Sequence, residues 1–317
     1  MKIVFLDGFT INPGDLNWAP LQEIGDFTVY DRTADSDIIN RSKEADVLIV
    51  NKTRLTAEHF AQLPNLKLVC EAATGFDNID VKAARQHNVS VCNCANYSTQ
   101  IVAQMVTSFL LEVADSVGSY TIRNHEGEWS RSKDFCYTIK ARYELTDKKI
   151  AIVGLGNIGS AVARIMLALG LRVFAVTSKE ADQLPSGISK ISVEEAFKTC
   201  DIVSLNCPLT ATNKGFVNSA LLAVSNPDLI LINTARGGLV IEQDVADALL
   251  KGQLGAYCTD VLSQEPARPD CPLLYAPRTF ITPHIAWNTL ESRQRILSIL
   301  VNNISSFFKG APEHVVN

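Results

Sequence analysis

The feature that most constrains the fold is a glycine-rich turn, GLGNIG, at residues 154–159. It directly follows an apolar run, Lys149–Val153, and it opens a stretch of helical periodicity. In such a strand–turn–helix unit the three glycines permit a tight turn, the approach of a phosphate to the backbone, and close packing of helix on strand. The N–H groups and the dipole at the start of the helix then hold the phosphates. We therefore favour a dinucleotide site over a plain turn. Its predicted phosphate-side residues are Gly154, Gly156, Asn157, Ile158 and Gly159.

The chain that follows this turn alternates short apolar runs with helical stretches. One helix is opened by Ser192, with Glu195 three residues on in the spacing of a capping box. Six strands in this order predict an α/β fold with a doubly wound parallel sheet of the Rossmann type, which binds ligands beyond the carboxyl ends of its strands. The predicted strands are Lys149–Val153, Arg172–Val176, Ile202–Leu205, Leu229–Asn233, Ala256–Thr259 and Thr279–Thr282; the other predicted helices are Asn157–Leu169 and Ile241–Lys251.

The N-terminal third shows the same alternation and predicts a second parallel sheet. Its predicted strands are Lys2–Leu6, Asp46–Asn51, Lys67–Glu71 and Val89–Cys92. Polar or glycine-containing residues follow three of them: Asp7-Gly8, Asn51-Lys52-Thr53 and Ala73-Thr74-Gly75. These segments are either loops that face a substrate or ordinary turns.

Three further segments complete the organisation. Residues 99–117 carry an apolar stripe at helical spacing, and residues 289–309 form a last amphipathic helix. Between them, residues 124–144 are polar and show no period, which is typical of an arm or a functional loop.

Composition excludes several classes of protein. The 317 residues favour two domains. The net charge is 29 − 34 = −5, and no basic stripe is present, which disfavours a nucleic-acid or anionic membrane surface. No window approaches the ~18 apolar residues of a membrane helix, and the N-terminus is too short in apolar residues for a signal peptide.

The cysteines point to a reducing compartment. The eight are scattered without a C-x-x-C pair, so we expect reduced thiols in the cytoplasm. His87 lies near Cys92 and Cys94 but lacks the paired spacing of a zinc site, so no metal is expected.

The end of the second Rossmann strand bears on the choice of dinucleotide. An NAD site usually places an acid there to bind the ribose 2′-OH, but this chain has Thr177, followed by Ser178 and Lys179. Two hydroxyls and an ammonium group suit a 2′-phosphate, so the sequence favours NADP. In the alternative, these residues form a solvated loop and Glu180 supplies the acid of an NAD site.

Three ionisable residues follow late strands of the predicted sheet: Arg236, Glu265 and His284. Each has a bland interpretation, as a surface arginine, a solvated loop acid or a histidine that caps the last helix. Because parallel strands bring their carboxyl ends to one edge, all three are expected to gather where the dinucleotide lies. That coincidence favours a catalytic set.

The chain resembles the D-2-hydroxyacid dehydrogenase family over nearly its whole length. The segments that carry the resemblance are ATGFDNID (73–80), NYSTQIVAQ (96–104), GLGNIG (154–159), NCPLT (206–210), INTARGG (232–238), TDVLSQEP (259–266) and TPHIAW (282–287). Within the family, VNKT (50–53), YST (97–99) and EWSRSKDFC (128–136) resemble the glycerate dehydrogenase and hydroxypyruvate reductase group. Two departures stand out: Thr177 replaces the usual Asp, and Asn206 stands where many members have His.

The resemblance implies a role for each site residue. Arg236 binds the substrate carboxylate, His284 exchanges a proton with the substrate oxygen, and Glu265 pairs with the other ring nitrogen of His284. Further cofactor contacts are implied for Cys207, Pro208, Thr212, Thr234, Ala235 and Asp260, with Asp260 near the nicotinamide carboxamide. Substrate contacts are implied for Asn51, Lys52, Thr74 and Gly75.

The resemblance also implies a discontinuous layout. Residues 1–99 and 285–317 form a smaller, flavodoxin-like substrate domain, into which a cofactor domain of residues 100–284 is inserted. Residues 100–145, with Met105 and the arm Trp129–Cys136, form a homodimer contact, in which Trp129 is a candidate to reach the partner's pocket.

The expected activity is NAD(P)-dependent reduction of a small 2-oxo acid of the hydroxypyruvate or glyoxylate type to the D-2-hydroxy acid, and the reverse oxidation. A D-lactate or phosphoglycerate type of dehydrogenase is an alternative, although the latter usually carries a C-terminal regulatory extension. A second alternative is a non-catalytic, dinucleotide-sensing protein of the corepressor type. Such proteins usually add disordered tails, whereas this chain ends at Asn317 soon after its last predicted helix.

Overall fold

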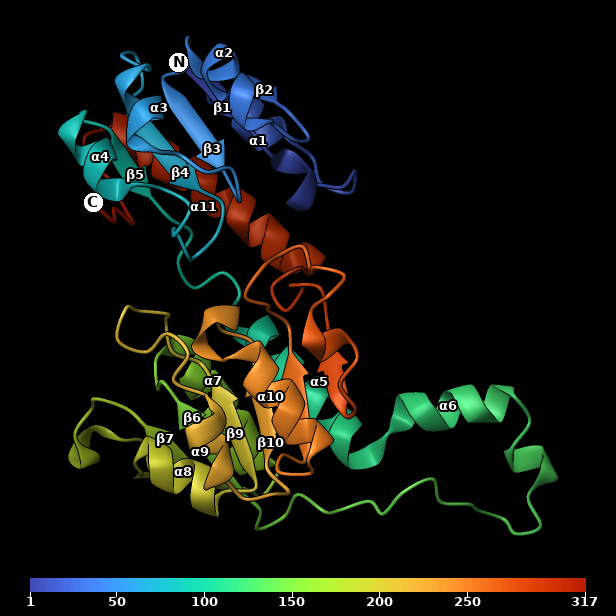
Figure 1. The fold of residues 1–317 in the computed structure, drawn as a ribbon. Coiled ribbons are helices and arrows are strands. Elements are labelled where there is room, and N and C mark those ends of the chain that lie inside the picture. Colours follow the sequence, from blue (N-terminus) through green and yellow to red (C-terminus); the bar gives the residue numbers. More distant parts are fainter. The chain divides into compact units, whose positions relative to one another are not determined.

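The computed structural model describes all 317 residues and divides the chain into two compact units (Figure 1). Unit 1 consists of Met1–Ser98 and Asn288–Asn317, and unit 2 is Thr99–Trp287. The sequence places the boundaries after residues 99 and 284, whereas in the structure they follow Ser98 and Trp287.

Unit 1 contains a five-stranded parallel sheet in the order β2-β1-β3-β4-β5. This is the order of the flavodoxin-like doubly wound fold. The strands are β1 (Lys2–Phe5), β2 (Asp26–Val29), β3 (Val47–Val50), β4 (Leu68–Glu71) and β5 (Ser90–Cys92). The edge strand β2 is absent from the sequence prediction. Its four residues are exposed or half-buried, so they lack the apolar run by which a buried strand is recognised.

The helices of unit 1 come from both ends of the chain. They are α1 (Ala19–Gln22), α2 (Ile38–Ser42), α3 (Ala57–Ala61), α4 (Val81–Gln86) and α11 (Leu290–Phe308). Buried Arg293 of α11 forms a bidentate ion pair with Asp15, with 2.6 Å between Nη2 and Oδ2. The Asn303 amide of the same helix donates to the carbonyl of Asn93 at 3.0 Å. The last helix is therefore an integral part of unit 1.

Unit 2 contains a seven-stranded parallel sheet in the order β12-β11-β10-β9-β6-β7-β8. Its strands are β6 (Lys149–Val153), β7 (Arg172–Val176), β8 (Ile188–Lys190), β9 (Ile202–Leu205), β10 (Ile230–Asn233), β11 (Ala256–Thr259) and β12 (Thr279–Ile281). The order reverses between β6 and β9, as in the Rossmann fold. The prediction of six strands is wrong by one, because β8 is a three-residue edge strand with two exposed side chains.

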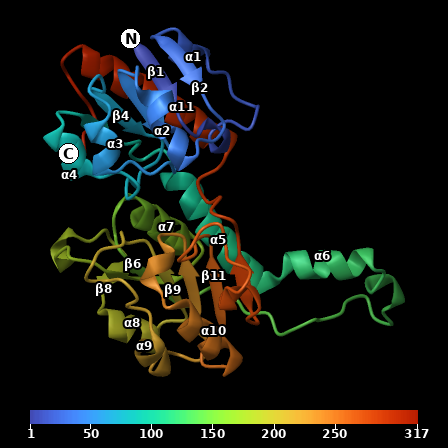
Figure 2. The same cartoon turned by 45° about the horizontal axis from the view of Figure 1, so that its top comes forward.

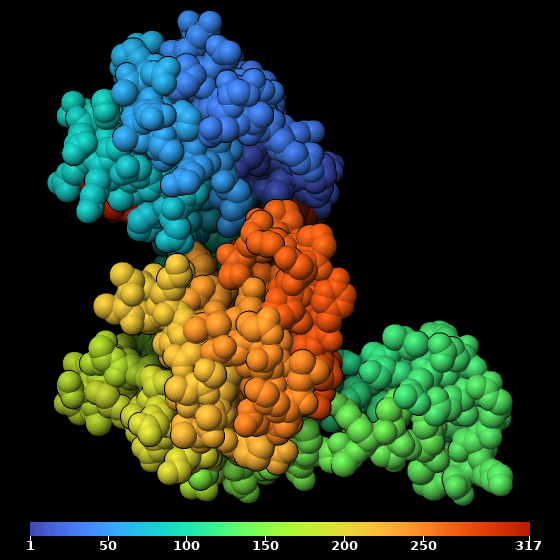
Figure 3. Space-filling view, viewed as in Figure 1, coloured from blue at the N-terminus to red at the C-terminus, as the bar shows by residue number.

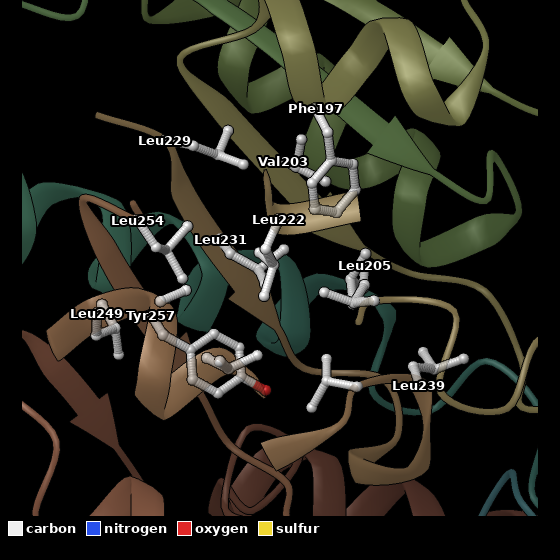
Figure 4. Close-up of a cluster of buried hydrophobic side chains, with 14 of the residues drawn as sticks. Phe197, Val203, Leu205, Leu222, Leu229, Leu231, Leu239, Leu249, Leu254 and Tyr257 are labelled. Atoms are coloured by element: carbon white, nitrogen blue, oxygen red, sulfur yellow. The ribbon is translucent and has the colours of Figure 1, made fainter. Parts of the chain in front are cut away.

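Alternate residues of these strands enter two separate cores. Ile150 and Ile152 of β6 point into one cluster, and Ala151 and Val153 point into the other. The helices α5 (Thr99–Asp115) and α7 (Asn157–Ala168), which pack along each other (Figure 2), cover the first face. The second face packs against α8 (Val193–Thr199), α9 (Ser219–Ala223) and α10 (Glu242–Leu250), as Figure 4 shows. A sheet buried on both faces explains why its strands are continuously apolar.

The helix predicted over residues 99–117 is broken. It ends at Asp115, because Ser116 adopts a left-handed conformation with φ 55°. The chain then continues as α6 (Val117–His125), bent by 58° from α5. No single helix is long and apolar enough to cross a membrane; α5 and α6 pass that test of length and composition only as a bent pair.

The segment expected to be an arm projects from the rest of unit 2 (Figures 1 and 3). The projecting element begins earlier than the predicted residues 124–144: it comprises α6, a single 3₁₀ turn at Trp129–Arg131 and a return segment that leads to β6, and it is called the arm below. The indole N–H of Trp129 donates to the carbonyl of Phe135 at 2.9 Å, which links the turn to the return segment.

Candidate active site

The three glycines of the turn after β6 meet three different steric requirements. Gly154 has φ +95°, and a Cβ there would lie 2.8 Å from the backbone of Cys207. A Cβ on Gly159 would lie 2.0 Å from the carbonyl oxygen of Gly154, so the first turn of α7 has room only for a glycine at position 159. A Cβ on Gly156 would meet no atom within 4 Å, which leaves open space over the start of the helix. A phosphate fits at that position.

A groove of about 640 Å³ lies beside this turn, at the point where the strand order reverses. Its lining includes many of the predicted cofactor residues: Gly154, Gly156, Thr177, Ser178, Lys179, Cys207, Pro208 and Thr212. Val193, Asn213 and Phe216 line it as well and were not predicted. The predicted residues Asn157, Ile158, Gly159, Thr234, Ala235, Arg236, Asp260 and His284 are not part of the lining.

Two buried oxygens at the same sheet edge have no hydrogen-bond partner within the chain. They are Oγ1 of Thr234, which follows β10, and Oδ1 of Asn206, which follows β9. Buried polar atoms are nearly always satisfied, so these two await a donor or acceptor from a ligand or water. Together with the open helix start at Gly156, they fit a bound dinucleotide.

The loop after β7 holds the residues on which the NADP and NAD interpretations differ. Thr177, Ser178 and Lys179 line the groove, whereas Glu180 does not. The carboxylate of Glu180 instead caps the 3₁₀ turn that follows it and lies 3.8 Å from the Lys190 ammonium group. In this structure the acid that the alternative requires is not part of the groove lining.

His284 and Glu265 form the closest pair of ionisable groups at this edge. Nδ1 of His284 lies 2.5 Å from Oε2 of Glu265, and Oε1 of Glu265 accepts the backbone N–H of Leu262 at 2.9 Å. The side chains are 26% and 35% exposed, so both remain accessible. Since Nδ1 is engaged, the free position on the imidazole is Nε2, on the opposite side of the ring.

The carboxylate of Asp260 holds the segment that carries His284. Its Oδ1 accepts the Thr282 hydroxyl at 2.5 Å and the Ile285 N–H at 2.8 Å, and its Oδ2 accepts the Ala286 N–H at 2.8 Å. Burial raises the pKa of Asp260 above its ordinary value, against the opposing effect of these hydrogen bonds. Both oxygens of Asp260 therefore hold the segment of His284; the predicted contact of Asp260 with the cofactor stays a prediction.

Two buried polar side chains shape the loop of Arg236. The Asn233 amide donates to the carbonyl of Arg236 at 2.9 Å and accepts the Ala235 N–H at 3.1 Å. The hydroxyl of Thr259 donates to the carbonyl of Asn233 at 3.1 Å, across from β11 to β10. The Nη1 of Arg236 in turn donates to the carbonyl of Ala235 at 2.8 Å. These supports were not predicted: Asn233 and Thr259 lie in the segments INTARGG and TDVLSQEP, but the sequence does not show which backbone groups their side chains contact.

Gly237 joins the loop of Arg236 to the loop of Glu265. A Cβ at Gly237 would lie 2.0 Å from the carbonyl carbon of Leu262 and 2.4 Å from the nitrogen of Ser263. The loops after β10 and β11 therefore touch at their backbones, which is possible only without a side chain at this position.

The predicted substrate residues lie in unit 1, at the carboxyl edge of its own sheet. Asp7, which follows β1, accepts the backbone N–H groups of Asn51, Lys52 and Thr53 at 2.8, 2.6 and 2.7 Å. The Asn51 amide donates to the carbonyl of Ala72 at 3.0 Å. The loops after β1, β3 and β4 are thus held together, while the side chain of Lys52 stays exposed.

The Thr74–Gly75 segment is fastened from the opposite side. The Thr74 hydroxyl donates to the carbonyl of Cys94 at 2.9 Å, and the Asn93 amide donates to the carbonyl of Thr74 at 2.7 Å. Unit 1 therefore brings Asn51, Lys52, Thr74 and Gly75 to one edge, and unit 2 brings Arg236, Glu265 and His284 to another.

Comparison with known proteins matches residues 107–286 to the family described as D-isomer specific 2-hydroxyacid dehydrogenase, NAD binding domain. The chain is 39% identical over 321 residues to a hydroxypyruvate reductase of Blautia hydrogenotrophica, which covers 100% of both proteins. It is 32% identical to a glycerate dehydrogenase of Methylorubrum extorquens, over 99% of this chain and 98% of the relative. Among solved structures, an acyclic imino acid reductase in complex with NADPH and D-Arg superposes with a TM-score of 0.88 at 29% identity, over 100% of both chains.

The contact at Gly237 yields a first prediction. Gly237→Ala should lower the free energy of unfolding by about 1–3 kcal/mol, because the new methyl group forces the two loops apart. Thermal and denaturant unfolding measure the change. Gly118→Ala, which adds the same group in α6 where only the flexible carboxylate of Glu112 lies within 4 Å, should leave stability within about 0.5 kcal/mol or raise it. Equal melting temperatures of Gly237→Ala and the parent protein would contradict the steric argument.

Proposed function

Because the chain belongs to the D-isomer specific 2-hydroxyacid dehydrogenase family, we propose that it reduces a small 2-oxo acid of the hydroxypyruvate or glyoxylate type to the D-2-hydroxy acid, and catalyses the reverse oxidation. The observation that carries the proposal is the His284–Glu265 pair at the dinucleotide edge of the sheet. The full-length similarity to a hydroxypyruvate reductase supports the substrate class.

Each residue of the set has a chemical task. The guanidinium of Arg236 offers a planar fork of N–H donors for the carboxylate of a 2-oxo acid. When bound, the nicotinamide supplies a hydride to the carbonyl carbon of the substrate. Nε2 of His284 donates a proton to the carbonyl oxygen in reduction and takes it back in oxidation. Glu265 orients the ring through Nδ1, since the two groups lie 2.5 Å apart.

The second prediction tests this assignment. Initial rates with NADH and NADPH are measured against hydroxypyruvate, glyoxylate, pyruvate and phosphohydroxypyruvate, and against a 2-oxo acid mixed with a primary amine. We expect the highest kcat/KM with hydroxypyruvate or glyoxylate. His284→Asn should lower kcat by about 10²–10⁴-fold, the usual contribution of a general acid–base group. The exposed His87, replaced in the same way, is the matched control and should leave kcat unchanged.

Two outcomes would refute the proposal. One is the absence of any dinucleotide oxidation with every 2-oxo acid, which would favour a dinucleotide-sensing protein. The other is a His284→Asn variant as active as the parent. Activity confined to the mixture with amine would move the substrate class to imino acids.

We further propose that NADPH is the preferred dinucleotide. The hydroxyls of Thr177 and Ser178 and the ammonium of Lys179 line the groove where the ribose 2′ position is expected, and no carboxylate lies among them to repel a phosphate. The position of Glu180 supports this preference, since the carboxylate lies 3.8 Å from the Lys190 ammonium group and is not among the residues that line the groove.

The third prediction concerns that preference. Thr177→Asp should lower the ratio of kcat/KM with NADPH to that with NADH by about 10–100-fold, because a carboxylate repels the 2′-phosphate and binds the ribose hydroxyls. Gln253→Glu, which adds a negative charge at the exposed turn after α10, should leave the ratio unchanged. A parent protein that prefers NADH from the start would overturn the argument.

We also propose that the arm mediates a homodimer. It exposes Val117, Ile122, Trp129 and Phe135, and Phe135 retains 89% of its accessible surface. Several exposed large apolar side chains on one projecting element are typical of a protein–protein contact. A second copy of the chain, with Trp129 directed toward the partner's pocket, is the proposed occupant.

The fourth prediction follows from this surface. Ile122→Asp combined with Phe135→Ser should convert the protein to a monomer at micromolar concentration, because the substitutions place polar groups in an apolar contact. Sedimentation velocity measures the change. Leu250→Asp alters an equally exposed apolar residue, 67% exposed on α10, and should leave the dimer intact. A parent protein that sediments as a monomer would contradict the proposal.

A further inference from the structure

A carboxyl group is buried at the end of β4 in unit 1. Glu71 is fully buried, and its Oε2 accepts the side-chain amide of Asn78 at 2.9 Å. Its Oε1 is also buried and has no hydrogen-bond partner in the chain. None of the roles assigned above uses this group.

The hydrogen bond between Glu71 and Asn78 closes the loop of residues 72–77. That loop contains Thr74 and Gly75, the proposed substrate contacts. The same amide nitrogen of Asn78 also donates to the carbonyl of Thr53 at 3.0 Å, and the carbonyl of Asn78 accepts the N–H of Leu55 at 2.9 Å. One side chain thus ties Glu71 to both loops that are expected to face the substrate.

The surroundings of Glu71 oppose a negative charge. Burial is the main cause that raises the pKa of Glu71 well above its usual range. The nearby carboxylates of Asp7 and Asp77 act in the same direction, while the Asn78 hydrogen bond and the ammonium of Lys52 act against it.

The neighbouring thiols of Cys70 and Cys94 add no charge beside Glu71. Burial likewise raises the pKa of Cys70 and of Cys94, so both stay neutral beside Glu71. An orphaned oxygen costs less on a neutral carboxyl than on a carboxylate, which has greater need of donors.

We propose that Glu71 is a positioning residue of the substrate site, a neutral carboxyl that fastens the loops after β3 and β4 through Asn78 and must stay uncharged for an anionic substrate to bind. The inference rests on the proposed function, because it takes the loop of Thr74 and Gly75, the substrate contacts that the family resemblance implies, as lying beside the anionic 2-oxo acid. An ionised Glu71 beside that loop would repel the bound anion and place an unpaired charge at the buried Glu71–Asn78 hydrogen bond, called the staple below.

The direction of the pH dependence follows from the neutral state. A folded-state pKa above the unfolded value means that the contribution of Glu71 to stability is present at low pH and is lost as the pH rises through the folded pKa. The same ionisation raises the KM for the 2-oxo acid. Glu71→Gln keeps an acceptor for Asn78 but has no proton to lose, so it abolishes both effects.

The experiment compares full-length parent, Glu71→Gln and Asn78→Ala between pH 6 and pH 9.5. The readouts are the KM and kcat for the best 2-oxo acid, and the melting temperature of the protein without substrate. Dividing the KM of the parent by that of Glu71→Gln at each pH removes any pH dependence that the two proteins share. We expect this ratio to rise by about tenfold on the alkaline side, with no parallel change in the ratio of kcat values.

The other variants separate the effect of the Asn78 hydrogen bonds from the effect of a charge on Glu71. Asn78→Ala should raise KM by about tenfold or more at every pH, because it removes both hydrogen bonds of the Asn78 amide, and should keep the alkaline rise. Glu44→Gln is the matched control, because Glu44 is an exposed acid paired with Lys2 at the opposite edge of the sheet, and it should behave as the parent.

The outcomes distinguish this inference from the proposed function. If no 2-oxo acid is reduced, the melting temperatures still decide. A parent protein that loses stability at alkaline pH relative to Glu71→Gln supports the neutral staple. Parallel melting profiles together with a constant KM ratio overturn it, even if the enzyme proves to be a 2-oxo acid reductase. Should Glu71→Gln fail to fold, an Asn78→Ala variant with unchanged KM overturns the staple.

Discussion

Both sheets are entirely parallel, and this constraint governs where chemistry can occur in the molecule. Every strand of a unit delivers its following loop to the same edge, where loops with unrelated sequences must be held beside one another without a ladder of hydrogen bonds. Carboxyl groups at the strand ends perform that task. Asp7 gathers three backbone N–H groups in unit 1, and Asp260 gathers two N–H groups and a hydroxyl in unit 2. Such charge-assisted bonds are stronger than neutral ones, so the loops are fixed before a ligand arrives.

The His284–Glu265 pair of unit 2 is held by contacts made to the backbone of the loops that carry it. Asp260 positions the segment of His284, and Gly237 allows the loop of Arg236 to touch the loop of Glu265. The three ionisable groups are consequently supported by neighbours that carry no chemistry themselves. A rigid support of this kind is what orients donors and acceptors before the reaction.

Elements with strong local sequence patterns were predictable, and elements with weak patterns were missed. The glycine turn and the continuously apolar strands identify the Rossmann sheet, because burial on both faces leaves few polar residues in β6, β9 or β10. The strands β2 and β8 escaped prediction, since edge strands are short and partly solvated. The break at Ser116 was missed as well, because the helical spacing of apolar residues continues past this position although the backbone there is left-handed. Arg236, Glu265 and His284 were identifiable from their places after strands, whereas Asn233, Thr259 and Gly237 act through contacts visible only in three dimensions.

The ion pair between Asp15 and Arg293 joins residues 278 positions apart in the sequence. This separation affects the order in which the two units can fold during translation. Unit 2 is continuous in sequence, so it has all its strands and helices before synthesis ends. Unit 1 begins first but stays incomplete until α11, which packs against β4 and α1, emerges. Domains generally fold as units during translation, so the dinucleotide unit is expected to form first although it comes second. The N-terminal strands would then be the part of the nascent chain most exposed to aggregation and most in need of a chaperone.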